Sequence, residues 1–276
     1  MTTKILWTYW HQGWADAPSL VQQCRRSWVR LNPDYEVRAL DRHTLFDQIE
    51  FPRGIDPGRK DLTVQKIAAL GRLALLAKYG GVWADATVVC TKPLSDWLEP
   101  YYESQFFAFR SPGPDRLMSN WFIAAEAQSV IVQRLYNSFA DFYADNYFTN
   151  QDTEIGNKLL EYYVPRWCAD IKSTLKWHTG FATKVLRVYP YFIFHYTFNK
   201  LILTDPECAE LWNLAKPFSA GPPHLLQFFE TRLVDGIEPA KQEIESGLTP
   251  MYKLNWRVDR SNSYWAAVLQ HLEPQP

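Results

Sequence analysis

Few features of this 276-residue sequence mark a specialised class of protein. Its cysteines are far apart and form no C-x-x-C pair, which argues against a zinc ribbon, a thioredoxin-type motif and a small disulfide scaffold; they are Cys24, Cys90, Cys168 and Cys208. The 29 Lys plus Arg residues nearly balance the 30 Asp plus Glu residues, so the basic excess typical of nucleic-acid binding is missing. We therefore expect a protein of a reducing compartment with no nucleic-acid partner.

Long apolar runs are missing as well. No run approaches the ~18 apolar residues of a membrane span, and the opening stretch has too short an apolar core for a signal peptide. Glycine is scarce, with 12 residues, and we find no internal repeat or low-complexity stretch. These absences favour a globular cytoplasmic protein, long enough for one large α/β domain or two small ones.

Aromatic residues, by contrast, are abundant, with 12 Trp, 15 Tyr and 16 Phe. Sugar-handling proteins use aromatic faces against pyranose rings, but aromatic side chains also contribute most to ordinary cores. Composition alone therefore favours core packing and leaves a carbohydrate ligand open.

The N-terminal segment has the pattern of a βαβ unit. Ile5–Trp10 is a nearly continuous apolar run, typical of a strand buried on both faces in a parallel sheet. Apolar residues recur at helical spacing from Val21 to Leu31, and Asn32-Pro33 ends that helix. Alternation from Tyr35 to Ala39 indicates a second strand. The sequence therefore predicts an α/β fold with a nucleotide-binding type of sheet.

The next segment predicts a ligand site. Residues from Lys66 to Tyr79 form a helix that is apolar on most sides and that Gly80-Gly81 ends. The short apolar strand Val82–Ala84 follows and delivers Asp85 at its carboxyl end. Ligands bind at this end of the strands in open α/β sheets.

The second half of the chain is less regular. Helical spacing recurs from Ile131 to Phe142 and from Val164 to Leu175, and the aromatic run Tyr189–Tyr196 separates these segments from the tail. Because no linker interrupts the sequence, we predict a single domain over 1–276, in which a sheet flanked by helices precedes a helical and irregular C-terminal half.

Asp85 carries the most chemistry of any predicted site residue. A carboxylate at the end of a buried strand, with glycines that allow close backbone approach, suits a hard divalent cation that holds a diphosphate. Arg72, two helical turns before the glycines, could reach a phosphate or brace the carboxylate. The structural alternative is that Asp85 caps a turn and the glycine pair only ends a helix, and the residues alone leave both interpretations open.

The segment from Arg72 to Thr87 reads R-x6-Y-G-G-hydrophobic-W-x-D-A-T. This pattern resembles the core of the capsular polysaccharide synthesis glycosyltransferases, whose relatives share a glycine pair before an Asp-x-Asp. The resemblance extends over most of the chain in short blocks, which are Ile5–Gly13, Ala17-Pro18, Cys24, Ser27-Trp28, Asn32-Pro33, Leu40-Asp41, Ser119–Ala125, Pro223–Gln227 and Tyr252–Trp256.

This resemblance implies a GT-A fold and a nucleotide-sugar donor. It implies a nucleotide-sugar-binding part over 1–100, and an acceptor side with a closing segment over 101–276. It also implies that the donor base and ribose lie near Trp7, Tyr9, Gln12 and Gly13, and that the remaining donor-binding residues are Arg72, Gly80 and Gly81.

The same resemblance makes Asp85 the first acid of a metal motif. With one carboxylate, Mn²⁺ or Mg²⁺ would take its other ligands from the diphosphate, water and His224 or Thr87. Lys253 would stabilise the leaving nucleoside diphosphate, unless it is a solvated lysine beside a strand. Asn120 would bind a sugar hydroxyl, unless it is a turn residue that begins a strand.

Two positions depart from the family pattern. Thr87 stands where the wider superfamily often has its second acid, although the capsular branch is similar to this sequence there. Ala69 stands three residues before Arg72, where relatives usually carry an Asp that contacts the nucleotide. These departures predict weaker or less selective donor binding.

We therefore predict a retaining glycosyltransferase that moves a sugar from a nucleotide sugar to a glycan or lipid-linked acceptor. It would act in capsule or surface polysaccharide synthesis, in the cytoplasm with a peripheral contact to the inner membrane. One alternative is a non-catalytic nucleotide- or glycan-binding module, which the Ala69 and Thr87 departures favour. The other is a glycoside hydrolase, which ranks last because it needs two carboxylates at the scissile bond and only Asp85 lies in a convincing site.

Overall fold

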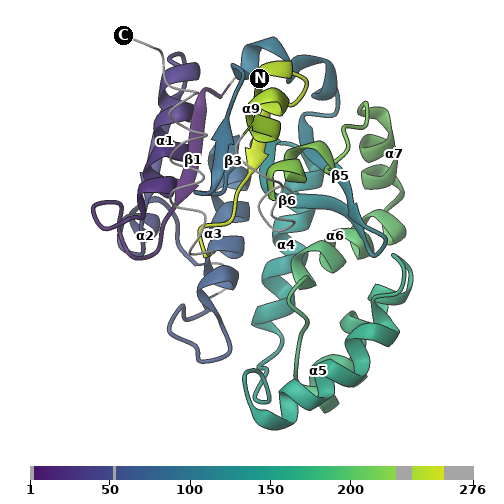
Figure 1. Cartoon of the computed structure of the whole chain (residues 1–276). Coiled ribbons are helices and arrows are strands. Elements are labelled where there is room, and N and C mark those ends of the chain that lie inside the picture. The colour runs from purple at the N-terminus through teal and green to yellow at the C-terminus, as the bar shows by residue number, and fades with distance from the viewer. Residues whose placement is uncertain (1–2, 52–53, 228–237, 258–276) are drawn as a thin grey trace.

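The computed structural model describes residues 3–51, 54–227 and 238–257, and a mixed sheet lies at its centre (Figure 1). The strand order is β2-β1-β3-β6-β5, with β1 parallel to β2 and β3, and β6 antiparallel to β3 and β5. The strands are β1 (Ile5–Tyr9), β2 (Glu36–Leu40), β3 (Gly81–Ala84), β5 (Phe106–Gly113) and β6 (Arg116–Ala125). The predicted α/β class is confirmed.

Helices surround this sheet, and Figure 1 shows α1 beside β1 on the left and α5 at the lower end of the molecule. The α-helices are α1 (Ser19–Leu31), α2 (Thr44–Gln48), α3 (Val64–Tyr79), α4 (Val130–Ala144), α5 (Glu154–Trp167), α6 (Ile193–Thr204), α7 (Pro206–Leu214) and α9 (Glu238–Ser246). Shorter helical turns are η2 (Leu94–Asp96), η3 (Glu99–Tyr101), η4 (Ser173–His178), η5 (Phe181–Leu186, a π-helix) and η6 (Pro222–His224).

The two faces of the sheet pack against different helices. Successive residues of a strand point to opposite faces, and here Leu6 and Trp7 enter different core clusters. Trp7 shares its cluster with apolar side chains of α3, α4 and α6, whereas Leu6 packs with Trp28 of α1. Burial on both faces explains why β1 and β3 are almost continuously apolar.

The predicted βαβ unit and the helix before Asp85 are confirmed. β1, α1 and β2 form the parallel unit. α3 ends at Tyr79, where Gly80 takes a φ of 70° as the C-cap, and β3 follows directly. Asp85 is therefore at the carboxyl end of β3, next to β1 in the sheet, and its N–H donates to the carbonyl of Trp121 at 2.8 Å.

A second, two-stranded sheet brings the C-terminal part of the chain to this end of β3. β4 (Val88–Cys90) pairs antiparallel with β7 (Met251–Lys253), and Val88 lies opposite Lys253. The N–H of Leu254 donates to the Thr87 carbonyl at 2.8 Å. This pairing fixes Lys253 beside the loop that carries Asp85.

Two sequence predictions about elements were wrong. The helix expected from Val164 to Leu175 ends at Trp167, because the Asp170 carboxylate accepts hydrogen bonds from the N–H and hydroxyl of Ser173 and starts a new turn. Asn120 does not begin a strand, since β6 starts at Arg116 and runs through it.

Within the described ranges, no helix combines the length and apolar character needed to cross a membrane.

Candidate functional site

A cavity of about 650 Å³ opens at the carboxyl ends of β1 and β3. Its volume lies in the range of ligand sites, roughly 300 to 1,000 Å³. Six of the residues predicted from sequence line it, namely Tyr9, Gln12, Arg72, Asp85, Asn120 and Lys253. The structure brings these six residues to one cavity, and their functional roles stay predictions.

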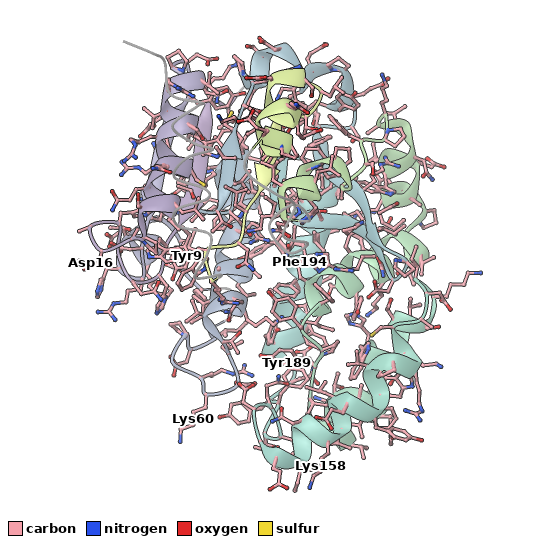
Figure 2. The ribbon with its side chains drawn as sticks, viewed as in Figure 1. Tyr9, Asp16, Lys60, Lys158, Tyr189 and Phe194 are labelled. Atoms are coloured by element: carbon pink, nitrogen blue, oxygen red, sulfur yellow. The ribbon has the colours of Figure 1, made fainter. Side chains whose placement is uncertain are left out.

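A second cavity of about 320 Å³ adjoins the first. Both have Gln65, Asp85, Asn120, Tyr191 and Lys253 in their walls, so the two cavities share one border. The second adds the nitrogen-bearing side chains of Lys66, Arg116, His195 and His224, together with Ala69 and several aromatic residues. Figure 2 labels one residue of each, Tyr9 for the first cavity and Phe194 for the second.

The Asp85 carboxylate stands between two cations at this border. Oδ1 accepts hydrogen bonds from Arg72 Nη2 at 2.8 Å and from Trp83 Nε1 at 2.9 Å. Oδ2 accepts from Lys253 Nζ at 3.2 Å, and the same ammonium group contacts the hydroxyl of Thr87. Both carboxylate oxygens are therefore already engaged by positively charged groups.

Arg72 reaches Asp85 from the middle of α3. Its side chain is 5% exposed, and the guanidinium carbon lies 4.8 Å from the ring centre of Trp83 and 5.6 Å from that of Phe194. Aromatic faces stabilise a desolvated cation and fix its orientation. Arg72 braces the carboxylate directly, one of the two roles that its position in the sequence predicted.

The cations decide the protonation of Asp85. Burial alone would raise the pKa of this carboxyl, but the charges of Lys253 and Arg72 and the hydrogen bond from Trp83 outweigh burial, and the pKa is lowered from its usual value. Asp85 is therefore ionised near neutral pH.

This arrangement does not fit the predicted divalent cation. A metal here would lie beside two cations, and at ~4 Å in an effective dielectric of ~20 its repulsion from one ammonium group is about 8 kcal/mol. His224, the other predicted ligand, lies near Gln227 and edge-on to Trp121. Across residues 3–51, 54–227 and 238–257, no three His, Cys, Asp or Glu side chains are grouped to hold a metal.

Aromatic side chains form part of the wall of the first cavity. The rings of Trp10 and Trp256 meet edge to face with centroids 5.1 Å apart. The Tyr9 hydroxyl lies 2.7 Å from His11 Nδ1, and both residues line the cavity. Such a wall offers stacking faces and polar edges to a planar ring.

Four residues predicted to bind the donor lie outside the walls of both cavities. Trp7 is fully buried, with its indole N–H donating to the Gly80 carbonyl at 2.9 Å. Gly80 and Gly81 lie at the amino end of β3, opposite Asp85. Gly13 closes a turn in which its N–H donates to Trp10. These four residues thus have structural contacts in a strand or a turn, and their donor-binding roles stay predictions.

Sequence reasoning missed Lys66 and Tyr191. Lys66 is 5% exposed, and its ammonium group donates to the Tyr191 carbonyl at 2.6 Å with no carboxylate in contact within the described part of the chain. Burial lowers the pKa of Lys66 to about 7. The signal was available: Lys66, Ala69 and Arg72 recur every third residue and share one face of α3.

Comparison with known proteins shows the family of this chain and several similar proteins. Residues 1–155 match the family described as capsular polysaccharide synthesis protein. Over 155 residues the chain is 32% identical to O-glycosyltransferase braB of Annulohypoxylon truncatum, covering 49% of this chain and 37% of that protein. Over 161 residues it is 30% identical to glycosyltransferase afumC of Aspergillus fumigatus, covering 50% and 40%.

A further relative is O-glycosyltransferase PaGT of Phomopsis amygdali, 24% identical over 160 residues that cover 51% of this chain and 39% of that protein. The chain thus spans about two fifths of the length of these curated relatives. Among solved structures, the PaToxG glycosyltransferase is similar over 78% of this chain and 87% of its own, with 13% identity and a TM-score of 0.36.

Proposed function

This chain belongs to the family of capsular polysaccharide synthesis proteins, and from that premise we propose that it is a glycosyltransferase. It moves a sugar from a nucleotide-sugar donor to a glycan or lipid-linked acceptor in capsule or surface polysaccharide synthesis. The names of its relatives support sugar transfer as the type of reaction.

The observation that carries the proposal is the pair of cavities that meet at Asp85, Asn120 and Lys253. A transferase must hold a donor and an acceptor on two sides of one anomeric carbon. The larger cavity has the volume and aromatic wall for the nucleotide, and the smaller one has room for a sugar. The groups at the shared border are polar and charged, as a reaction centre requires.

Within this arrangement each border residue has a distinct part. Lys253 and Arg72 attract the diphosphate, and Asp85 keeps both cations in place. Asn120, which faces both cavities, hydrogen-bonds a hydroxyl of the transferred sugar. Trp10 and Trp256 stack with the base.

We propose transfer with retention of the anomeric configuration. The bond between the anomeric carbon and the diphosphate oxygen breaks, and its electron pair stays on the phosphate. The acceptor oxygen forms the new bond on the same face and gives its proton to the departing phosphate. Charge grows on the diphosphate as the bond breaks, so the Lys253 ammonium stabilises the transition state more than the bound donor.

The reaction is proposed to occur in the cytoplasm, with peripheral contact to the inner membrane where a lipid-linked acceptor would be met. The four unpaired cysteines support a reducing compartment, and three of them are buried.

A binding and turnover experiment tests the proposal. The purified protein is heated with each of a panel of nucleoside diphosphates and nucleotide sugars, because a ligand that binds only the folded state raises the melting temperature. One nucleotide sugar should raise the melting temperature. Mass spectrometry should then detect slow hydrolysis of that nucleotide sugar or transfer of its sugar to an acceptor. Asn120→Ala should lower the rate more than it lowers the affinity for the free nucleoside diphosphate.

Two outcomes contradict the proposal. If no compound of the panel raised the melting temperature, the proposal of a nucleotide-sugar donor would be wrong. Binding without turnover, in the presence of glycan and lipid-linked acceptors, would identify a nucleotide-binding module in place of a transferase.

A further inference from the structure

The ammonium group of Lys253 occupies the place where a motif metal would be expected. It lies between the carboxylate of Asp85 and the hydroxyl of Thr87, the first and third residues of the Asp85-Ala86-Thr87 segment. A cation that bridged these two positions would have to displace it. The two oxygen atoms are thus already joined by a positive charge that belongs to the chain.

The backbone holds Lys253 in this place. Lys253 lies opposite Val88 in the β4–β7 pair, and the next residue, Leu254, donates its N–H to the Thr87 carbonyl at 2.8 Å. Its side chain is 19% exposed. A lysine fixed by strand register and largely removed from solvent loses little further conformational entropy when it binds an anion.

Arg72 supplies a second fixed cation on the other side of Asp85. It uses Nη2 for the carboxylate, while Nε and Nη1 are buried and have no hydrogen-bond partner in the part of the chain that the structure describes. Two cations therefore share one carboxylate, and the site keeps a net positive charge. A buried charge surplus of this kind is matched by an anionic ligand.

We infer that Lys253, together with Arg72, takes the place of the divalent cation, so that this site binds a nucleoside diphosphate without metal. The inference rests on the proposed function, because it concerns the same donor. Each phosphate of a nucleotide sugar carries a negative charge, and these charges neutralise the surplus of the site. Asp85 then acts as a positioning residue that orients the two cations and has no direct bond to the diphosphate.

The first test measures binding with and without metal. The protein is freed of metal with EDTA, and UDP, GDP, ADP, CDP and dTDP are titrated by calorimetry in EDTA, in Mg²⁺ and in Mn²⁺. The nucleotide that binds should do so in EDTA with a Kd within about threefold of its value with metal. Binding only in the presence of metal overturns the inference and leaves the proposed function standing. No binding under any condition overturns both.

The second test exchanges the cation. Lys253→Met, which keeps the length of the side chain, should weaken binding in EDTA by about tenfold or more. Lys253→Arg should retain binding, and circular dichroism reports whether each variant folds. Lys158→Met is the matched control, since Lys158 is 71% exposed on α5, at the lower edge of the molecule in Figure 2. Unchanged affinity in a folded Lys253→Met protein overturns the inference.

A third variant rebuilds a two-acid motif. Thr87→Asp combined with Lys253→Met removes the internal cation and adds a carboxylate two residues after Asp85. This double variant should bind Mn²⁺ in the absence of nucleotide, which electron paramagnetic resonance measures as a loss of signal from the free ion. In EDTA its affinity for the nucleotide should be lower than that of the parent. The parent protein should bind no Mn²⁺ in the same assay, and Mn²⁺ binding by the parent, reversed by Asp85→Asn, overturns the inference.

Discussion

Asp85 links two cations to one another, so its contribution to stability depends on pH. Its pKa is lowered in the folded protein, mainly because the charges of Lys253 and Arg72 outweigh the effect of burial. The unfolded chain therefore binds a proton at a higher pH than the folded protein does. The stabilisation is present above the unfolded pKa, about 4, and is lost as the pH falls through the lower folded value.

We predict that Asp85→Asn lowers the free energy of unfolding at neutral pH. Arg72 would keep a buried charge without its carboxylate, at a cost of roughly 2 to 3 kcal/mol for a pair that is partly exposed. Urea unfolding of the parent and the variant at several pH values measures this cost. The difference should shrink below about pH 4. A difference that stays constant with pH would mean that the ion pairs do not stabilise the fold.

The buried charge of Lys66 destabilises the folded protein, whereas the charge of Asp85 stabilises it, but both groups make stability rise with pH. Burial lowers the pKa of Lys66 to about 7, from the ordinary value of 10.5, so between these values the unfolded chain binds a proton that the folded protein does not. Raising the pH through this range therefore stabilises the folded protein. Below about pH 7 the folded protein carries the full penalty of a buried charge.

We predict that Lys66→Met raises the melting temperature at pH 6. Methionine keeps the length of the side chain and removes the charge, a gain on the order of 1 to 3 kcal/mol after loss of the bond to the Tyr191 carbonyl. The advantage over the parent should narrow as the pH rises from about 7 to 10. Melting curves of both proteins across this pH range measure the difference in melting temperature. A difference that did not change with pH would show that another group pairs with Lys66.

Sequence reasoning located the residues of this site better than it located their contacts. Asp85 and Arg72 follow from local pattern, since a buried helix, a glycine cap and a short strand occupy one continuous segment. The contact between Lys253 and Asp85 depends on the pairing of β4 with β7, which are distant in the chain. No local periodicity reports such pairing, so the occupation of the expected metal position by an ammonium group was beyond prediction.

At the scale of elements, the predictions that rest on a strong local apolar pattern were confirmed, and the one that a side-chain hydrogen bond interrupts was wrong. The strand at Ile5–Tyr9 and the helix at Val64–Tyr79 have strong apolar patterns and were predicted almost to their ends. The 164–175 helix has apolar spacing too, but the Asp170 side chain hydrogen-bonds the backbone and ends the regular structure near it. A polar side chain that hydrogen-bonds the backbone can end a helix, and the spacing of apolar residues does not report this competition.

The junction between α3 and β3 has little tolerance for change. Gly81 has a φ of 99°, in the region that favours glycine, and a Cβ built on it would lie 2.4 Å from the Ile5 carbonyl oxygen. Both the dihedral angle and the contact with β1 therefore exclude a side chain. Gly81 thus allows the parallel strands β1 and β3 to approach, while a Cβ on Gly80 would meet the backbone of Ala125 and Ala127.

We predict that Gly81→Ala destabilises the protein by about 3 kcal/mol or more, the sum of backbone strain and displacement of β1. Urea unfolding measures the loss. Gly58→Ala is the matched control, because Gly58 has no positive φ and its Cβ would come no closer than 3.2 Å, to a carboxylate oxygen of Asp56. If Gly81→Ala were as stable as the parent, the close contact between Gly81 and the Ile5 carbonyl of β1 would be wrong.

At the scale of the whole molecule, no boundary in the core matches the division at residue 100. One cluster contains Trp7 of β1, Phe139 of α4 and Trp212 of α7. β3 pairs with β6, and β4 pairs with β7, so two of the described strands before residue 100 have partners after it. The described part of 101–276, which excludes 228–237 and 258–276, adds β5 and β6 to the central sheet and pairs β7 with β4, so it packs with elements of the first 100 residues.

This architecture predicts that the described elements unfold in one cooperative transition. A destabilising substitution at the start of β3 should then lower the stability of α4, α6 and α7 as much as that of β1, because these helices share one core with the sheet. Pulse-labelling hydrogen exchange with mass spectrometry reads the peptides of β1 and of α4–α7 separately along a urea titration. In the parent all should share one midpoint, and Gly81→Ala should lower that midpoint equally in both groups. Helices that keep the parent midpoint while β1 loses protection would form a separate cooperative unit, and the single domain predicted over 1–276 would then be two.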